Sequence, residues 1–162
     1  MVVGVFSKFD SIIEKNQNHI VLVNPSDMGN LGTILRTALG FNISNIAIIK
    51  PCVDIFNPKV VRASMGALFS LNIQLFDSFD DYYKENANNN MYPFMLKATK
   101  TLQSLQDKKH PFSLIFGNEG SGLDDSFLNI GQSIIIKHSH NIDSLNLSIS
   151  VALALYEFTK NI

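Results

Sequence analysis

Three short segments carry residue types that could bind a ligand or take part in a reaction. The first, Asn24–Arg36, follows an apolar run, Ile20–Val23, and mixes turn-forming and polar residues before a helical pattern begins. The second, Phe116–Leu123, has three glycines in the spacing GxxGxG around a single glutamate, and the third, Asp143–Ser148, contains two serines and an asparagine. Polar loops that follow buried strands lie at the carboxyl edge of an α/β sheet, where such proteins bind ligands.

Arg36 is the conspicuous residue of the first segment, because the chain has only two arginines. A guanidinium is planar, permanently charged and forked, which suits a phosphate or a developing alkoxide. Because it stays protonated in proteins, it is a poor general base. We therefore expect Arg36 to be an electrostatic clamp and hydroxyl activator. The alternative is an ordinary helix-surface arginine in an ion pair.

The glycine-rich segment has neither the spacing of the dinucleotide fingerprint nor a Walker lysine. Gly117, Gly120 and Gly122 allow positive φ and a close approach of the backbone to a ligand, although a simple turn would have the same composition. Glu119 between them is either a group that orients hydroxyls or amines of a ligand or a solvated carboxylate.

In the third segment, Ser144 is a natural helix N-cap, and capping alone could explain it. Asn146 lies among apolar residues and needs a hydrogen-bond partner if it is buried. His138 and His140 would share one face of a strand, but no third convergent ligand is evident, so we expect no metal site. The sequence contains no HExxH motif and no GxSxG elbow.

Composition limits the classes of protein that this chain can belong to. A length of 162 residues indicates one domain, and a net charge of −1 argues against non-specific coating of nucleic acid without excluding a local basic patch. No apolar run approaches the roughly 20 residues that span a bilayer. A single cysteine, Cys52, excludes an internal disulfide, and we expect a cytoplasmic protein that has no membrane contact.

Strand and helix patterns alternate, which indicates an α/β fold with a mostly parallel sheet covered by helices on both faces. The expected strands are Ile20–Val23, Ile46–Ile49, Asn72–Phe76, Phe94–Ala98, Ser113–Phe116 and Ser133–Lys137. The expected helices are Leu31–Phe41, Pro58–Phe69, Asp80–Glu85 after the cap Ser78, and a polar helical turn at Thr101–Gln106, with a loop at Asn86–Asn90. The last segment, Ser144–Phe158, alternates like a strand but is long for one, so pattern alone favours a helix only slightly.

Taken together, the three segments resemble the motifs of the SPOUT superfamily of RNA methyltransferases, in its SpoU-type (TrmH-like) branch. The similar stretches are DMGNLGTILRTA (Asp27–Ala38), IFGNEGSGL (Ile115–Leu123) and SLNLSISVALALYE (Ser144–Glu157), with VVRASMGALF (Val60–Phe69) similar to an intervening helix. The resemblance covers the chain from about His19 to its C-terminus. Residues 1–18 are then an N-terminal extension and residues 19–162 the catalytic domain.

The resemblance implies an α/β fold whose C-terminal part forms a deep trefoil knot, a feature that composition cannot indicate. It also implies S-adenosylmethionine as cofactor, a homodimer, and methylation of a ribose 2′-hydroxyl in tRNA or rRNA, and it makes the last segment a helix. The functional positions that it implies are Asn30, Arg36, Glu119, Ser144 and Asn146. The cofactor would be held by Phe116, Gly117, Asn118, Gly120, Gly122, Ile136, His138 and Leu145.

The chain departs from the family pattern at two places. Met28 stands where proline is usual, and Ile136-Lys137-His138 stands where the family has Ile-Pro-Met, with His140 at a usual glycine. These departures leave an alternative open, a non-catalytic knotted RNA-binding or assembly module with a degenerate cofactor pocket. A base-methylating relative is disfavoured, because the SLN motif with Asn30 and Arg36 resembles the ribose branch.

Overall fold

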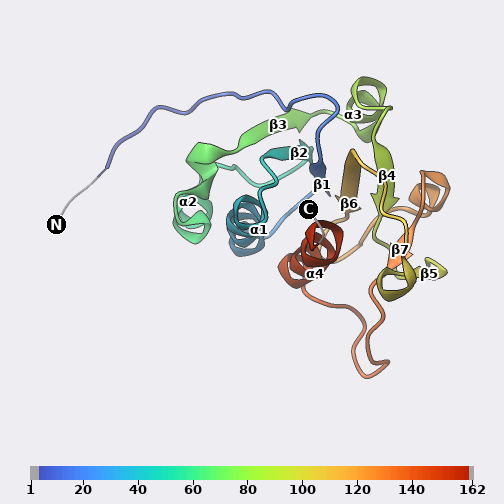
Figure 1. Cartoon of the computed structure of the whole chain (residues 1–162). Helices are drawn as coiled ribbons and strands as arrows, with labels where there is room; N and C mark the ends of the chain where they lie inside the picture. Colours follow the sequence, from blue (N-terminus) through green and yellow to red (C-terminus); the bar gives the residue numbers. More distant parts are fainter. Residues whose placement is uncertain (1–3, 161–162) are drawn as a thin grey trace.

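The computed structural model describes residues 4–160 and shows a parallel sheet flanked by helices (Figure 1). The main sheet contains β1 (His19–Val23), β2 (Asn45–Ile49), β3 (Asn72–Phe76), β4 (Asn90–Pro93) and β6 (Phe112–Phe116). Its strands are all parallel and lie in the order β3-β2-β1-β6-β4. A second parallel pair joins β5 (Lys100–Thr101) to β7 (Ile134–Ile135).

Helices cover both faces of this sheet. The four α-helices are α1 (Met28–Gly40), α2 (Pro58–Ser64), α3 (Phe79–Glu85) and α4 (Leu147–Thr159), and three 3-10 helices are η1 (Ala67–Ser70), η2 (Leu102–Ser104) and η3 (Asp125–Asn129). The first core lies between the sheet and α1, α2 and α4, and the second between the sheet and α3 and η3. No helix within residues 4–160 is long and apolar enough to cross a membrane.

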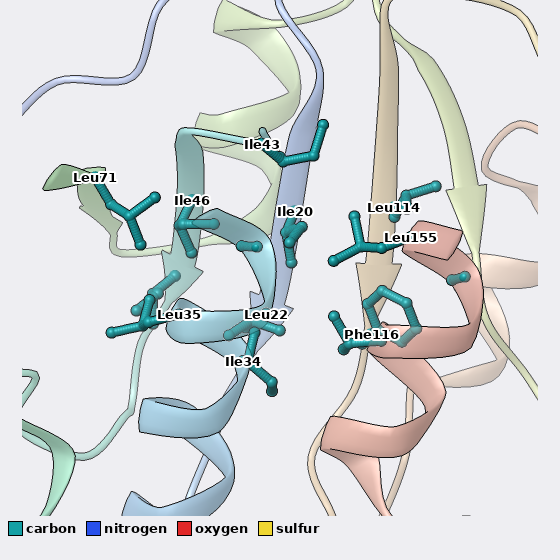
Figure 2. Packing of buried hydrophobic residues seen from close by; sticks show 14 of the residues in the cluster. Ile20, Leu22, Ile34, Leu35, Ile43, Ile46, Leu71, Leu114, Phe116 and Leu155 are labelled. Carbon is teal, nitrogen blue, oxygen red and sulfur yellow. The ribbon is translucent and has the colours of Figure 1, made fainter. Parts of the chain in front are cut away.

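Alternation of side chains along the central strands produces the two cores. On β1, Ile20 and Leu22 face α1, where Ile34 and Leu35 pack beside them (Figure 2), whereas Val21 belongs to the opposite core. Every residue of β2 and β6 is buried, as expected for strands covered on both faces. The expected α/β class with a parallel sheet is therefore confirmed.

Two expected strands lie elsewhere or are shorter. The strand expected at Phe94–Ala98 is β4, four residues earlier, and Phe94 makes only an isolated bridge to Ile134. Asn90, expected in a loop, is the first residue of that strand. The apolar run continues past β4, so composition does not mark where pairing with β6 stops. The strand expected at Ser133–Lys137 shrinks to β7, because its partner β5 is only two residues long.

The helix expected at Pro58–Phe69 is interrupted. It ends at Ser64, because Met65 and Gly66 adopt positive φ of 51° and 90°, and the chain then continues as η1. Gly66 tolerates this conformation, which stops the run of helical hydrogen bonds. By contrast, the short helix α3 has Ser78 as its N-cap, as predicted, with the Ser78 hydroxyl accepting from the Asp81 N–H.

Candidate active site

The sheet brings the first two motif segments together. β1 and β6 are parallel neighbours, with Leu22 paired to Phe116, so the loops that leave these strands lie side by side at the carboxyl edge. The third segment leads into α4, which packs on α1 and on β6. Residues about 90 to 120 positions apart in the sequence therefore meet at one place.

Glu119, from the glycine-rich loop, holds the loop that follows β1. Its Oε2 accepts hydrogen bonds from the Ser26 N–H (3.0 Å) and hydroxyl (2.7 Å), and its Oε1 accepts from the Asp27 N–H (3.1 Å). Partial burial alone would raise the pKa of the Glu119 carboxyl, but these hydrogen bonds together outweigh burial and lower the pKa below its ordinary value. Glu119 is thus an ionised group that fixes the geometry of the first segment.

Asn30 and Asn146 extend this network to the third segment. The Asn30 Nδ2 lies 3.5 Å from Glu119 Oε1, and the Asn146 Nδ2 donates to Asn30 Oδ1 at 3.0 Å. Asn146 Oδ1 accepts from the Ser148 N–H at 2.9 Å and hydroxyl at 2.7 Å, so Asn146 is the N-cap of α4. Ser144 does not cap this helix, because α4 begins three residues after it, so the capping alternative considered for Ser144 is wrong.

Asn118 organises the glycine-rich loop from within. Its Nδ2 donates to the Asn24 carbonyl at 2.8 Å, and its Oδ1 accepts from the N–H groups of Gly120 (2.9 Å) and Ser121 (3.2 Å). The Gly122 N–H donates to the Asn118 carbonyl at 2.9 Å and closes the turn. The amides of residues 120–122 therefore have partners inside the loop.

Gly117 packs directly against the backbone of Gly122 in the same turn. A Cβ at this position would lie 2.1 Å from the carbonyl carbon of Gly122, so no other residue fits without moving the loop. Gly122 itself has a φ of 69°, which glycine adopts without strain. The two glycines make a tight turn whose rim borders a cavity.

This cavity has a volume of about 380 Å³, within the range that small-molecule ligands occupy in proteins. All eight residues predicted to hold a cofactor line it, namely Phe116, Gly117, Asn118, Gly120, Gly122, Ile136, His138 and Leu145. Glu119 and Ser144 line it as well, whereas Asn30, Arg36 and Asn146 do not. The apolar lining includes Phe94, stacked on Phe116 with ring centroids 4.6 Å apart. Flat apolar surface beside polar groups fits a nucleoside cofactor.

Sequence reasoning missed the lining residues that come from the loop after β4 and from η3. The sequence pattern predicts a strand over Phe94, Leu96 and Lys97, and Asp125 lies outside the three motif segments, but all four residues line the cavity. In the structure the side chain of Leu96 is 58% exposed, which the apolar run in the sequence does not indicate.

The two histidines of the altered loop do not share a strand. The Ile136 carbonyl can only accept, so the His138 Nδ1 donates to it at 2.8 Å, and His138 lines the cavity while His140 is exposed. Among residues 4–160, no group of three or more His, Cys, Asp or Glu side chains converges as metal ligands.

Arg36 lies exposed on α1, outside the Glu119–Asn30–Asn146 network. Within residues 4–160 its guanidinium has no hydrogen bond and no carboxylate within 4.0 Å, so the structure does not show the ordinary surface ion pair considered from the sequence. A single chain therefore leaves this charge available for another molecule.

Comparison with known proteins agrees with the three motifs. Residues 17–156 match the model of the SpoU rRNA Methylase family. An uncharacterized tRNA/rRNA methyltransferase of Synechocystis is 35% identical over 141 residues, covering 85% of this chain and 51% of the relative. A Listeria innocua protein, provisionally named tRNA (cytidine(34)-2′-O)-methyltransferase, is 30% identical over 146 residues, 86% of this chain and 85% of the relative.

Among solved structures, an AdoMet-bound rRNA methyltransferase from Sinorhizobium meliloti superposes with a TM-score of 0.83 at 28% identity, covering 95% of this chain and 59% of that one. The chain thus spans about half the length of some relatives and most of the length of others. On the family match and the shared fold, this chain belongs to the SpoU rRNA methylase family of RNA methyltransferases.

Proposed function

We propose that this chain transfers a methyl group from S-adenosylmethionine to a ribose 2′-hydroxyl of tRNA or rRNA. The observation that carries the proposal is the network of Glu119, Asn30 and Asn146 beside a cavity lined by the glycine-rich loop. The names of the relatives, an rRNA methyltransferase bound to AdoMet and a tRNA 2′-O-methyltransferase, support it. Neither favours a non-catalytic module.

The cavity is the place that we assign to the cofactor. When bound, S-adenosylmethionine supplies an electrophilic methyl group on its sulfonium. Transfer to an oxygen is an in-line displacement, so the protein must align the two reactants. The turn from Gly117 to Gly122 and the hydrogen bonds of Asn118 hold one wall of the cavity rigid, which provides that alignment on the donor side.

The polar groups beside the cavity would align and activate the RNA. Ser144 is exposed on the lining and can exchange hydrogen bonds with a ribose, while Asn30 and Asn146 fix the edge on which the sugar rests. Arg36 would bind a phosphate or stabilise the alkoxide that develops at the 2′-oxygen. Glu119 would act indirectly, by holding the first segment in place.

We also propose that the active form is a homodimer. α4 is apolar on its outer side, where Ile149, Leu153 and Tyr156 follow one another at i, i+4 and i+7 with 51%, 42% and 60% of their surface exposed. Such a stripe is suited to a second copy, and α1, which carries Arg36, packs beside α4. We place the trefoil knot in the segment between Gly117 and Asn146, which leaves β6 and returns to the cavity.

The test is methyl transfer from labelled S-adenosylmethionine to separated tRNA and rRNA fractions. We expect the Arg36→Ala variant to lose roughly 100-fold or more in rate, the size expected when one transition-state electrostatic contact is removed. Arg62→Ala removes the other arginine of the chain, an exposed residue of α2, and should stay within about twofold of the unmodified protein. Digestion of the product to nucleosides should place the label on ribose. Label on a base, or an unchanged rate for Arg36→Ala, would contradict the proposal.

A further inference from the structure

One pair of charges borders the cavity without a role in the proposed reaction. Lys97 follows β4, and Asp125 is the first residue of η3. The Lys97 Nζ donates to both carboxylate oxygens of Asp125 at 2.7 Å, and both residues line the cavity. Their side chains are 66% and 64% exposed, so the pair lies at the open rim rather than in the interior.

Three backbone amides of the glycine-rich loop at this cavity already have partners. Within the glycine-rich loop, the N–H groups of Gly120 and Ser121 donate to the Asn118 side chain, and that of Gly122 donates to the Asn118 carbonyl. A carboxylate that entered the cavity would have to break the turn in order to use them. A cationic side chain on the lining would bind such a carboxylate more strongly than a neutral donor.

Lys97 is the one lysine or arginine on the described lining of the cavity. The acidic side chains there are those of Glu119, Asp125 and Asp143, and Glu119 is occupied by Ser26 and Asp27. The lining thus carries more negative than positive charge, which suits a cofactor whose net charge is positive. Any carboxylate on that cofactor has Lys97 as its cationic partner.

We infer that Lys97 and Asp125 recognise the amino-acid end of S-adenosylmethionine, with Lys97 binding its α-carboxylate and Asp125 its α-ammonium. The inference rests on the proposed function, which supplies the cofactor. The amino-acid end carries one positive and one negative charge on neighbouring groups, and the Lys97–Asp125 pair presents the complementary two. An exposed ion pair contributes little to folding, so widening it to admit the ligand costs little. In the bound state the Lys97 ammonium faces the ligand carboxylate, and the Asp125 carboxylate faces the ligand ammonium.

The test compares three ligands by titration calorimetry, namely S-adenosylmethionine, S-adenosylhomocysteine and 5′-methylthioadenosine, which lacks the amino-acid end. Lys97→Met should raise the Kd of the first two about tenfold, the size expected for one charge-assisted hydrogen bond, and leave the third within about twofold. Asp125→Asn should show the same selectivity, and Lys97→Arg should restore binding. Lys100→Met is the matched control, because Lys100 is exposed in β5 and does not line the cavity.

Two results would overturn the assignment. An equal loss for all three ligands would mean that Lys97 only supports the loop, and unchanged binding of S-adenosylmethionine would mean that it is not a contact. If Lys97→Met does not fold, as judged by circular dichroism, the Asp125→Asn and Lys97→Arg variants decide between the same outcomes. If the unmodified protein binds none of the three ligands, the proposed function fails and this assignment with it.

Discussion

Glu119 illustrates how a single side chain can serve a reaction without touching the reactants. Its two oxygens accept from the backbone of Ser26 and Asp27 and from the Ser26 hydroxyl, and one lies within reach of Asn30. A carboxylate is suited to this task because it accepts at both oxygens, whereas an amide would turn an NH₂ group toward donors. The charge therefore holds the loop after β1 against the glycine-rich loop.

Replacing Glu119 by Gln should slow methyl transfer about tenfold or more, because at least one charge-assisted hydrogen bond to the loop is lost. Cofactor affinity should change by less than about threefold, since the turn held by Asn118 stays intact. Single-turnover rates and calorimetric Kd values separate the two effects. Glu85→Gln, an exposed change on α3, is the matched control and should alter neither. A Glu119→Gln variant of full activity would show that the loop keeps its shape without the charge.

At this scale, the sequence predicts the glycine-rich loop better than the start of α4. Gly117, Asn118 and Gly122 form a turn within six residues, so their types and spacing carry most of the information about it. Ser144 and Asn146 are both good N-caps two positions apart, and local pattern does not choose between them. Asn146 also contacts Asn30, 116 residues earlier. Only the tertiary structure brings these two residues together, so local sequence pattern does not predict the contact.

Among the elements, the crossing of α1 and α2 depends on Gly32. A Cβ on this residue would lie 2.5 Å from the Ala63 Cβ and 2.7 Å from the Val60 carbonyl oxygen, so the two helices touch almost backbone to backbone. α1 carries Asn30 and Arg36 on either side of this contact. The close packing therefore fixes the position of both residues relative to the sheet.

Gly32→Ala should lower the free energy of unfolding by about 1–3 kcal/mol, because overpacking forces the helices apart. This loss is expected although alanine has the higher helix propensity by about 1 kcal/mol. Gly40→Ala, at the last residue of the same helix, meets no atom within 4 Å and should be neutral or slightly stabilising. Urea denaturation of the two variants measures the difference. Equal stabilities would mean that α2 moves aside at no cost.

The elements that sequence pattern misplaced share a physical cause. β4 is set by its register with β6, where Asn90 pairs with Phe112, and the apolar residues after Pro93 turn instead toward the cavity. Likewise β7 exists only because a two-residue partner lies beside it. Central strands such as β1 and β2 were predicted within a residue, because a strand buried on both faces is apolar throughout and ends at polar residues.

At the scale of the whole molecule, a series of buried side-chain hydrogen bonds connects the elements at the amino edge of the sheet, opposite the site. The His19 Nε2 donates to the Glu14 carbonyl at 2.8 Å, which leaves Nδ1 free to accept from the Tyr82 hydroxyl at 2.9 Å. Tyr82 in turn accepts from the Ser113 hydroxyl at 2.6 Å, and Ser113 accepts from the Asn89 Nδ2 at 3.0 Å. These hydrogen bonds join the segment before β1 to β1, α3 and β6, and with this tautomer of His19 each bond has one defined donor.

Stability should consequently fall in mild acid. Burial lowers the pKa of His19 below its ordinary 6.5, against a smaller raising effect of the Glu14 carbonyl. Protonation at Nδ1 would place its new N–H against the Tyr82 hydroxyl, so Tyr82 would have to turn its own O–H toward Ser113, and the buried imidazole would carry a charge. The unfolded chain therefore binds a proton that the folded chain does not, so the stabilisation is complete above about pH 6.5 and is lost as the pH falls toward the lowered folded pKa.

Denaturation with urea at a series of pH values from 7.5 to 5 tests this directly. The unmodified protein should lose stability across that range, whereas His19→Gln should be about 1–3 kcal/mol less stable at pH 7.5, because it leaves buried groups unpaired, but should show a shallower pH dependence. His140→Gln changes an exposed histidine and should keep both the stability and the slope of the unmodified protein. If His19→Gln retained the full slope, the acid sensitivity would arise at another histidine or at the carboxylates. The network lies at the edge opposite the cavity, so cofactor affinity at pH 7.5 should be the same in all three proteins. Equal affinities would separate the stability of the fold from the chemistry that it supports.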